Sequence, residues 1–240
     1  GQTRPMMAGV FEDGSLFAVP GFSFTFTPGT KTTRDTSVYI RLGLDGAVVD
    51  TIGHFLDNEQ ATVAGEGGAF RTTPPFGRST YKAVHGDAVY VADNEHYEVA
   101  VHGVDGVLRR LIRKTHEPLP VTAADLSAAR ERMLEGESDE NFRKMRERIF
   151  DEIPLHKTMP AFSNLVVDSE GNIWIQEYRR PGDDEPRWTV FDPSGQMLGT
   201  LTLPAQFRVT EIGSDYVLGV WRDEFDVEHV QLYGLEKPEA

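Results

Sequence analysis

The sequence contains no cysteine and no long hydrophobic run. The absence of cysteine excludes disulfide frameworks, thiolate metal sites and cysteine nucleophiles. No stretch approaches the roughly eighteen uninterrupted apolar residues of a membrane-spanning helix, so we expect no transmembrane segment. Residues 1–10 lack an initiator methionine and the charged-then-apolar pattern of a secretion signal. We therefore expect either that a leader has been removed or that the chain is a portion of a longer one.

Positive charge and catalytic motifs are also scarce. The chain has 24 Lys and Arg against 38 Asp and Glu, which gives a net charge of −14. Such a surface repels phosphate backbones, so nucleic acid is not an expected partner. The H-E-x-x-H and G-x-S-x-G motifs are absent, and the glycine-rich GEGGAF at residues 65–70 lacks the P-loop Lys-Ser/Thr, so we interpret it as a flexible loop. The sequence therefore predicts no catalytic residue, no zinc site and no cofactor.

What the sequence does contain is a recurring pair of tight turns. Turns of the D-G or G-D kind between apolar alternations are strong hairpin signals. One set comprises FEDGSLF, VHGDAVY, DSEGNIW and IGSDYVL, and a second set that alternates with it comprises GLDGAVV, GVDGVLR and DPSGQML. From a first-set glycine to the next second-set glycine the spacing is 32, 20 and 24 residues, which leaves room for two strands and one loop. Each repeating unit therefore has four strands.

Tandem four-stranded units are typical of a β-propeller, in which each unit is one blade. The four-strand pattern is clearest in the third unit, with the strands SNLVVDS, NIWIQEY, RWTVFDP and QMLGTLTL. We predict an all-β fold, a single propeller domain over residues 1–240 with four antiparallel blades; a β-sandwich is the alternative. The fourth unit ends after its third strand, so we expect these to be four blades of a larger ring. Open blade edges of this kind could also pair with another copy or another protein.

A helical hairpin is predicted between the second and third units, at about residues 120–154. Thr122 with Asp125 three residues later predicts the start of one helix, and Ser138 the start of another. We expect the apolar stripe of the second helix to pack on the propeller. That stripe consists of Phe142, Met145, Ile149 and Ile153.

Blades two and three resemble the six-bladed propellers of the NHL type, through VYVADNEHYEVAVHGVDG and VVDSEGNIWIQEY followed by WTVFDPSGQMLGTL. The region of about 160–235 is also similar to a group of uncharacterised, generally exported bacterial six-bladed propellers that carry a similar helical insertion. The resemblance implies two further blades upstream and a periplasmic or extracellular location. It brings no assigned activity and no catalytic residues.

Long connections are predicted to gather on one rim of the propeller, because the tight turns all fall on the other. This rim would carry residues 20–36, DNEHYE, RRPGDDEP and RDEFDVE, together with the long connections between blades. Loops longer than about a dozen residues are uncommon unless functional or disordered. The rim is therefore interpreted as a docking surface, against the alternative that these insertions are only tolerated there.

Two charged loops supply candidate residues on that rim. Clustered carboxylates suit Ca²⁺, which takes six to eight oxygen ligands, so a calcium site is one interpretation of these loops. The arginines interleaved with the carboxylates instead favour an ion-pair network between neighbouring blades, and this is the interpretation that we prefer. The residues are Arg179, Arg180, Asp183, Asp184 and Glu185 in one loop, and Arg222, Asp223, Glu224 and Asp226 in the other.

Other candidates lie near the second blade and in the first long loop. Asn94, Glu95 and His96 lie in DNEHYE, where Asn94 also suits a turn with left-handed backbone. Arg71 and Arg78 precede the channel strand of the second blade, where they could meet an anionic ligand or pair with acids. An apolar patch for a partner is predicted at Phe22, Phe24 and Phe26, whereas Trp174 and Trp221 are predicted to pack between sheets.

The function that these features favour is a non-catalytic binding or scaffold module that docks a protein or small ligand on its long-loop rim, in the cell envelope. The alternative is a metal-dependent propeller hydrolase or lactonase with its site on the central channel. That alternative requires carboxylates or amides from several blades to converge on the axis. A self-assembling structural subunit is a third hypothesis.

Overall fold

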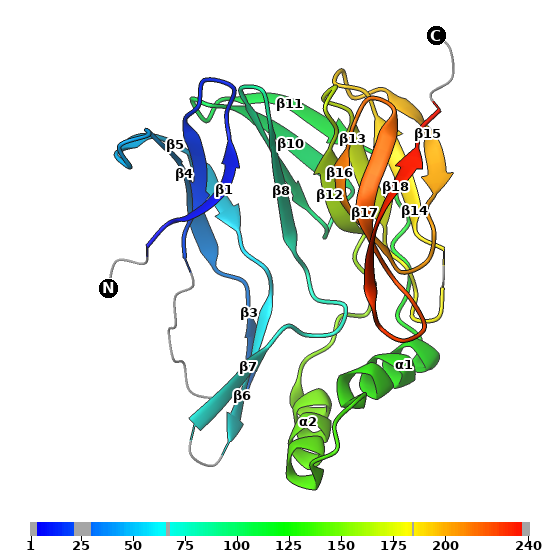
Figure 1. The fold of residues 1–240 in the computed structure, drawn as a ribbon. Helices are drawn as coiled ribbons and strands as arrows, with labels where there is room; N and C mark the ends of the chain where they lie inside the picture. Colours follow the sequence, from blue (N-terminus) through cyan, green and yellow to red (C-terminus); the bar gives the residue numbers. More distant parts are fainter. Residues whose placement is uncertain (1–3, 22–29, 66–67, 184, 237–240) are drawn as a thin grey trace.

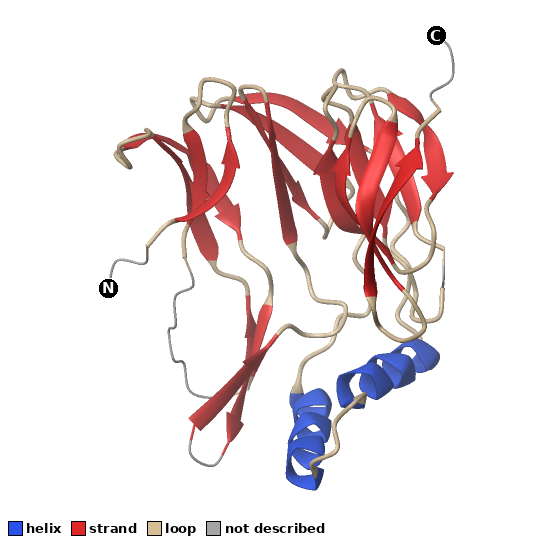
Figure 2. Cartoon of the chain, in the orientation of Figure 1, coloured by secondary structure: helices blue, strands red, loops and turns tan. Residues whose placement is uncertain are grey.

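The computed structural model describes residues 4–65, without 22–29, and 68–236, without 184. Its described part contains eighteen strands and two helices (Figure 2). The strands form five antiparallel sheets of three or four strands each. The prediction of an all-β fold with a helical insertion is therefore confirmed.

Four of these sheets follow one another along the chain, and in each the strands pair in chain order. We call them the first to the fourth sheet. The first contains β1 (Met6–Val10), β2 (Leu16–Val19), β4 (Thr36–Leu42) and β5 (Val48–Leu56), and the second contains β8 (Thr80–His85), β9 (Ala88–Asp93), β10 (Glu98–Gly103) and β11 (Leu108–Arg113). The third contains β12 (Phe162–Val167), β13 (Ile173–Glu177), β14 (Arg187–Phe191) and β15 (Met197–Thr202). The fourth has three described strands, as predicted, namely β16 (Phe207–Ile212), β17 (Tyr216–Arg222) and β18 (Glu228–Gly234).

The tight turns that defined the repeat join these strands. Six of the seven turn glycines have positive φ, and Gly213 is the exception among them. Gly106 has φ 76°, and a Cβ placed on it would lie 2.6 Å from the carbonyl oxygen of Ile52. Only glycine meets both conditions without strain, so this turn also fixes how closely the second sheet approaches the first.

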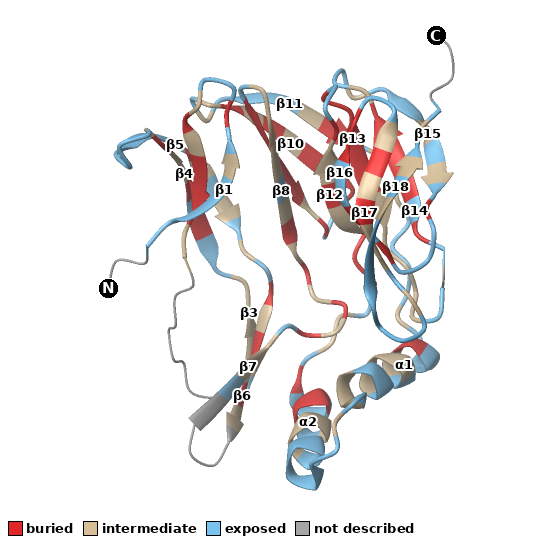
Figure 3. Cartoon of the chain, in the orientation of Figure 1, coloured by how far each residue is buried: buried red, intermediate tan, exposed pale blue. Residues whose placement is uncertain are grey.

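Neighbouring sheets pack face to face through separate apolar clusters (Figure 3). Phe17 and Tyr39 of the first sheet meet Val89 and Val91 of the second. A second cluster joins the second and third sheets. A third joins the third and fourth sheets, and there Trp174 is buried and Trp221 partly buried, which confirms their predicted packing role. The first strands of the four sheets also contact one another in order, β1 with β8, β8 with β12 and β12 with β16.

An inserted sheet, which the sequence analysis did not predict, consists of β3 (Lys31–Thr33), β6 (Gln60–Gly65) and β7 (Gly68–Thr72). Its strands come from two connections of the first sheet that were interpreted as loops. In particular, β7 begins within GEGGAF, so the interpretation of all six residues as a flexible loop is wrong. The reason is that β3 pairs with a segment about thirty residues away, and local sequence patterns carry little information on such pairing.

The predicted helices are α1 (Ala123–Leu134) and α2 (Glu140–Glu152). Thr122 and Asp125 form the predicted capping box of α1. The cap of α2 is Asp139 rather than Ser138, because the Asp139 carboxylate accepts hydrogen bonds from the backbone N–H groups of residues 141 and 142. No helix in the described part of the chain is long and apolar enough to cross a membrane.

The apolar stripe of α2 packs elsewhere than predicted. Ile149 and Ile153 are buried against Ala61 and Val63 of the inserted sheet, not against the four main sheets. Phe142, at the start of the stripe, is 55% exposed. The stripe therefore joins two insertions to each other. The hairpin is closed at its base by a bridge between residues 120 and 158.

All the long insertions lie at one end of the molecule, and the tight turns lie at the other (Figure 1). The inserted sheet and both helices project from the same end, below the four sheets in this view. We call this the long-loop end. Its described connections comprise residues 20–21, 30–35, 57–65, 68–79, 94–97, 114–161, 178–183, 185–186, 203–206 and 223–227.

Candidate functional site: the long-loop end

Most of the predicted site residues lie at the long-loop end, but they do not form one site. Phe22, Phe24, Phe26 and Asp184 fall outside the described residues, so the predicted aromatic patch stays a prediction. The others divide into three places on the loops: a polar junction beside the second sheet, the loop that faces α1, and the loop of the fourth sheet. These hold Arg78, Asn94, Glu95 and His96, then Arg179, Arg180 and Asp183, and then Arg222, Asp223 and Glu224. Arg71 lies apart from them, on β7 of the inserted sheet.

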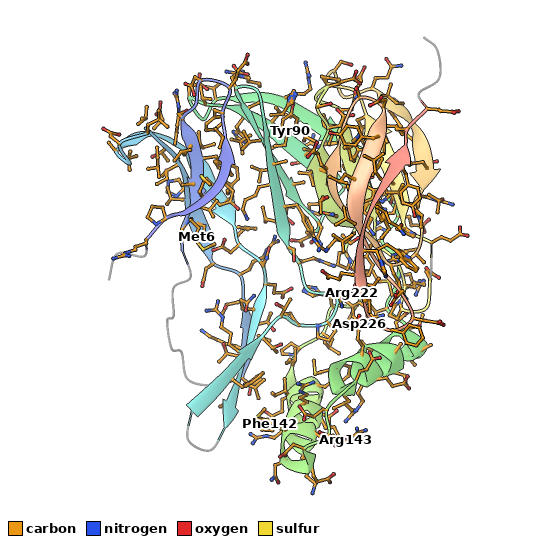
Figure 4. The ribbon with its side chains drawn as sticks, viewed as in Figure 1. Met6, Tyr90, Phe142, Arg143, Arg222 and Asp226 are labelled. Carbon is orange, nitrogen blue, oxygen red and sulfur yellow. The ribbon has the colours of Figure 1, made fainter. Side chains whose placement is uncertain are left out.

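Arg222 pairs within its own hairpin. Its guanidinium lies 2.9 Å from a carboxylate oxygen of Asp226 and 2.8 Å from one of Glu228. Figure 4 shows the Arg222 and Asp226 side chains close together at the long-loop end. The Asp223 carboxylate lies 2.9 Å from Nε2 of the His229 ring. In the described residues these pairs do not reach the neighbouring loop, so the predicted network between blades is wrong here. The reason is register, because Glu228 lies directly opposite Arg222 in the sheet.

Arg180 connects its loop to α1. Its guanidinium donates to the Asp125 carboxylate at 2.6 Å and to the carbonyl oxygen of Pro120 at 3.2 Å. Its backbone N–H donates to the carboxylate of Asp183 at 3.1 Å. Asp125 is only 5% exposed and also completes the capping box of α1. Arg180 thus holds the helical hairpin against the third sheet, a role that the sequence interpretation did not include.

Asn94 is a buried structural residue, with only 2% of its surface exposed. Its side-chain oxygen accepts from the N–H of Ser79 at 2.7 Å, and its side-chain nitrogen donates to the carbonyl oxygen of Phe162 at 3.0 Å. Its φ is not positive, so the suggested left-handed turn is wrong. The amide instead joins the second sheet to the third. Glu95 and His96, next in the chain, are exposed.

Arg78 is also buried rather than open to a ligand. Its guanidinium donates to the carbonyl and hydroxyl oxygens of Thr158, at 3.2 and 2.9 Å, and its backbone N–H donates to Glu59 at 2.8 Å. Burial lowers the pKa of Arg78, although Glu95 and Glu59 oppose this. Glu59 in turn contacts His156 at 2.7 Å. This junction ties the inserted sheet, the hairpin base and the second sheet together.

Arg34 is a central residue of the same junction that sequence reasoning missed. It contacts the Asp93 carboxylate at 2.9 Å, the Thr80 hydroxyl at 3.0 Å and the carbonyl oxygen of Asp57 at 2.7 Å. Its partners come from three separate segments. No local pattern around Arg34 indicates this convergence, because it depends on the pairing of β3 with β6.

Two pockets open beside the sheets at the long-loop end. One, of about 580 Å³, is bounded by the first sheet, the inserted sheet and β8, and Arg71 is on its wall. We call it the β8 pocket. The other, of about 600 Å³, lies beside β11, β13 and β14 and includes Arg179 and Asp183. We call it the β13 pocket. Both volumes are in the range of small-molecule sites, roughly 300–1,000 Å³.

The β13 pocket has a hydrogen-bonded cluster at its wall, centred on Glu177. One carboxylate oxygen accepts from the Lys114 ammonium at 2.6 Å, the Thr189 hydroxyl at 2.6 Å and the Tyr97 hydroxyl at 3.0 Å. Burial alone would raise the pKa of Glu177, but the hydrogen bonds from Lys114 and Thr189 outweigh it and lower the pKa. Burial and the adjacent carboxylate raise the pKa of Tyr97, so its phenol stays neutral. The cluster therefore holds a lysine–glutamate ion pair between the second and third sheets.

The described residues contain no group of three or more His, Asp or Glu side chains placed to hold a metal ion. In the β13 pocket the ammonium of Lys114 and the carboxylate of Glu177 pair with each other at 2.6 Å.

The chain was compared with family models, curated proteins and solved structures. No family model matches the chain, and no curated protein matches it. Fourteen chains of solved structures match, among them one described as "Crystal structure of the eukaryotic initiation factor", with a TM-score of 0.38 and 6% identity. That match covers 97% of this chain and 52% of the other, so this chain spans about half the length of that protein. A likeness at this level carries no argument about fold or function.

Proposed function

We propose that this chain is a non-catalytic binding module that takes a small ligand or a protein partner at its long-loop end. The observation that carries the proposal is that the insertions and both pockets gather at that end, while the opposite end has only tight turns. Loops on a rigid β scaffold are where binding sites are usually built. The packed sheets supply the scaffold.

We also propose that the four main sheets are an arc of four blades from a six-bladed propeller. Its support is that the sheets pack in sequence and their first strands contact one another in order. The two terminal sheets of the arc have faces with exposed apolar side chains: Met7 on the first sheet is 67% exposed, and Val230 and Leu232 on the fourth are 77% and 63% exposed. Such faces suit the packing of further sheets. The resemblance to exported propellers supports a place in the cell envelope.

Native mass spectrometry of the purified protein tests the binding role. We expect a fraction of the 26.8 kDa chain to carry a non-covalent organic adduct or a partner, which is released on denaturation. Metal analysis of the same sample is the control for the alternative function. One equivalent of a tightly held divalent metal per chain, without any organic adduct, would contradict the proposal and favour the hydrolase.

A further inference from the structure

The outer edge of β18 is unpaired in the part of the chain that the structure describes. β18 pairs with β17 from Glu228 to Gly234, and the order of strands in the fourth sheet ends with it. Each of the other three main sheets continues to a fourth strand. Their third strands, β4, β10 and β14, all contain buried residues, whereas β18 contains none. β18 therefore has the place of an inner strand in the repeat and the exposure of an edge strand.

β18 also lacks the features that commonly protect an edge strand, which include bulges, lysine and proline. The outer strands of the other three main sheets, β5, β11 and β15, each show a register shift against their inner neighbour. β18 pairs with β17 without any shift. Its sequence, EHVQLYG, has one acid at its start and no lysine, arginine or proline. A straight and unprotected edge of this kind is a template for another strand.

The even-numbered residues of β18 turn their backbone groups toward this edge. The N–H of Leu235 donates to the carbonyl oxygen of Asp215, next to β17, at 2.7 Å. Because these groups alternate in direction along a strand, the N–H and C=O groups of residues 228, 230, 232 and 234 point away from β17. The side chains of Val230 and Leu232 are 77% and 63% exposed, whereas Tyr233, on the opposite face, packs against the cluster between the third and fourth sheets.

We propose that the edge of β18 pairs with the same edge in a second copy of this chain, antiparallel and across a two-fold axis at Gln231. In this register Val230 lies opposite Leu232 of the other copy, and this apolar pair occurs twice because of the symmetry. Glu228 lies opposite Gly234 of the other copy, so no like charges meet. The edge-facing groups of the two strands then form about eight backbone hydrogen bonds.

The self-complementarity of the strand is what favours a second copy. A two-fold axis at Val230 would place Glu228 opposite Leu232 and would shorten the overlap, and an axis at Glu228 would place two carboxylates opposite each other. Only the axis at Gln231 combines the longest overlap with matched apolar pairs. The inference is independent of the binding role proposed above, since no residue of β18 lines either pocket.

Sedimentation equilibrium of the purified chain measures the association. We expect the mass to rise from 26.8 kDa toward twice that value between about 1 and 100 μM, because a seam of two strands is smaller than the roughly 1,600 Å² of a standard interface. A folded chain that stays monomeric over this range would overturn the inference. If that monomer carries an organic adduct in native mass spectrometry, the binding role stands and only the pairing of β18 fails.

Val230→Pro tests whether the edge carries the association. Proline removes an N–H that points away from β17, and an edge strand tolerates proline at such a position. We expect dimerisation to weaken by about thirtyfold, since one hydrogen bond is lost in each half of the seam. Val230→Ile keeps the N–H and the apolar side chain and is the matched control, which should dimerise like the wild-type chain. Unchanged dimerisation of a folded Val230→Pro variant would refute the pairing.

Single cysteines test the register, because the chain has no cysteine of its own. In Gln231→Cys the two thiols lie opposite each other at a pair without backbone hydrogen bonds, where Cα atoms are about 4.5 Å apart, within the range of a disulfide. Glu228→Cys is the control in the same strand, since its counterpart is six residues away, at about 20 Å. We expect oxidation to give covalent dimers of Gln231→Cys and not of Glu228→Cys. Equal dimer yields from both variants, or none from Gln231→Cys, would contradict the proposed pairing.

Discussion

Replacement of Glu177 by alanine is expected to lower the free energy of unfolding by about 3 kcal/mol, at the lower end of the range for a broken buried ion pair. The lower end applies because the side chains of Glu177 and Lys114 are 19% and 28% exposed. The variant leaves the Lys114 ammonium and the hydroxyls of Tyr97 and Thr189 without their shared acceptor. Urea unfolding at neutral pH measures the loss.

The exposed pair of Arg113 and Glu98 provides the matched control. These side chains are 68% and 36% exposed, and they meet at 2.6 Å. Glu98→Ala should cost less than about 1 kcal/mol, as exposed ion pairs do. A loss for Glu177→Ala no larger than that of Glu98→Ala would contradict the structural role of the cluster.

The same cluster predicts the direction of an acid-side pH dependence. The hydrogen bonds from Lys114 and Thr189 outweigh burial and hold the folded pKa of Glu177 below its ordinary value of 4.5. A carboxyl with a lowered folded pKa contributes stability above its unfolded pKa, and that contribution is lost as the pH falls through the folded value. Below about pH 4.5 the wild-type chain should therefore lose stability more steeply than Glu177→Gln.

Asn94→Ala is expected to lower the free energy of unfolding by about 3 kcal/mol, because it leaves one buried and one partly buried backbone group without a hydrogen-bond partner, and an unsatisfied buried group costs about 1–3 kcal/mol. These groups are the N–H of Ser79 and the carbonyl of Phe162. Chemical denaturation followed by tryptophan fluorescence measures the effect.

His96→Ala is the comparison for Asn94, since His96 is two residues away and exposed. It should change stability by no more than about 0.5 kcal/mol. If Asn94→Ala instead keeps full stability and loses ligand binding, then the sequence interpretation of Asn94 as a binding residue holds and the structural assignment does not.

Much of the fold could be predicted because its signals are local. The turn glycines, such as Gly46 and Gly195, mark hairpins within a few residues, and strand pairing in chain order follows from them. The capping box at Thr122 is equally local. The inserted sheet could not be predicted in this way, because β3 reaches β6 across the whole of β4 and β5.

The predicted site residues of the described chain lie at the long-loop end, as their loops indicated, but they do not form one site. Arg222 and Asp223 were chosen for their charge, and their charges are satisfied within one hairpin. Glu177 gave less indication, since its partner Lys114 is 63 residues away.

Site-specific photo-crosslinking in the native host tests the central claim most directly, that the long-loop end is the binding surface. A photoreactive residue is placed at exposed Glu95 or Glu185 at that end, and at Leu44 or Val107 in the tight turns of the opposite end, which are 84% and 59% exposed. We predict that specific adducts form from Glu95 and Glu185 and not from Leu44 and Val107. Adducts that form equally from both ends, or only from the tight turns, would contradict the account.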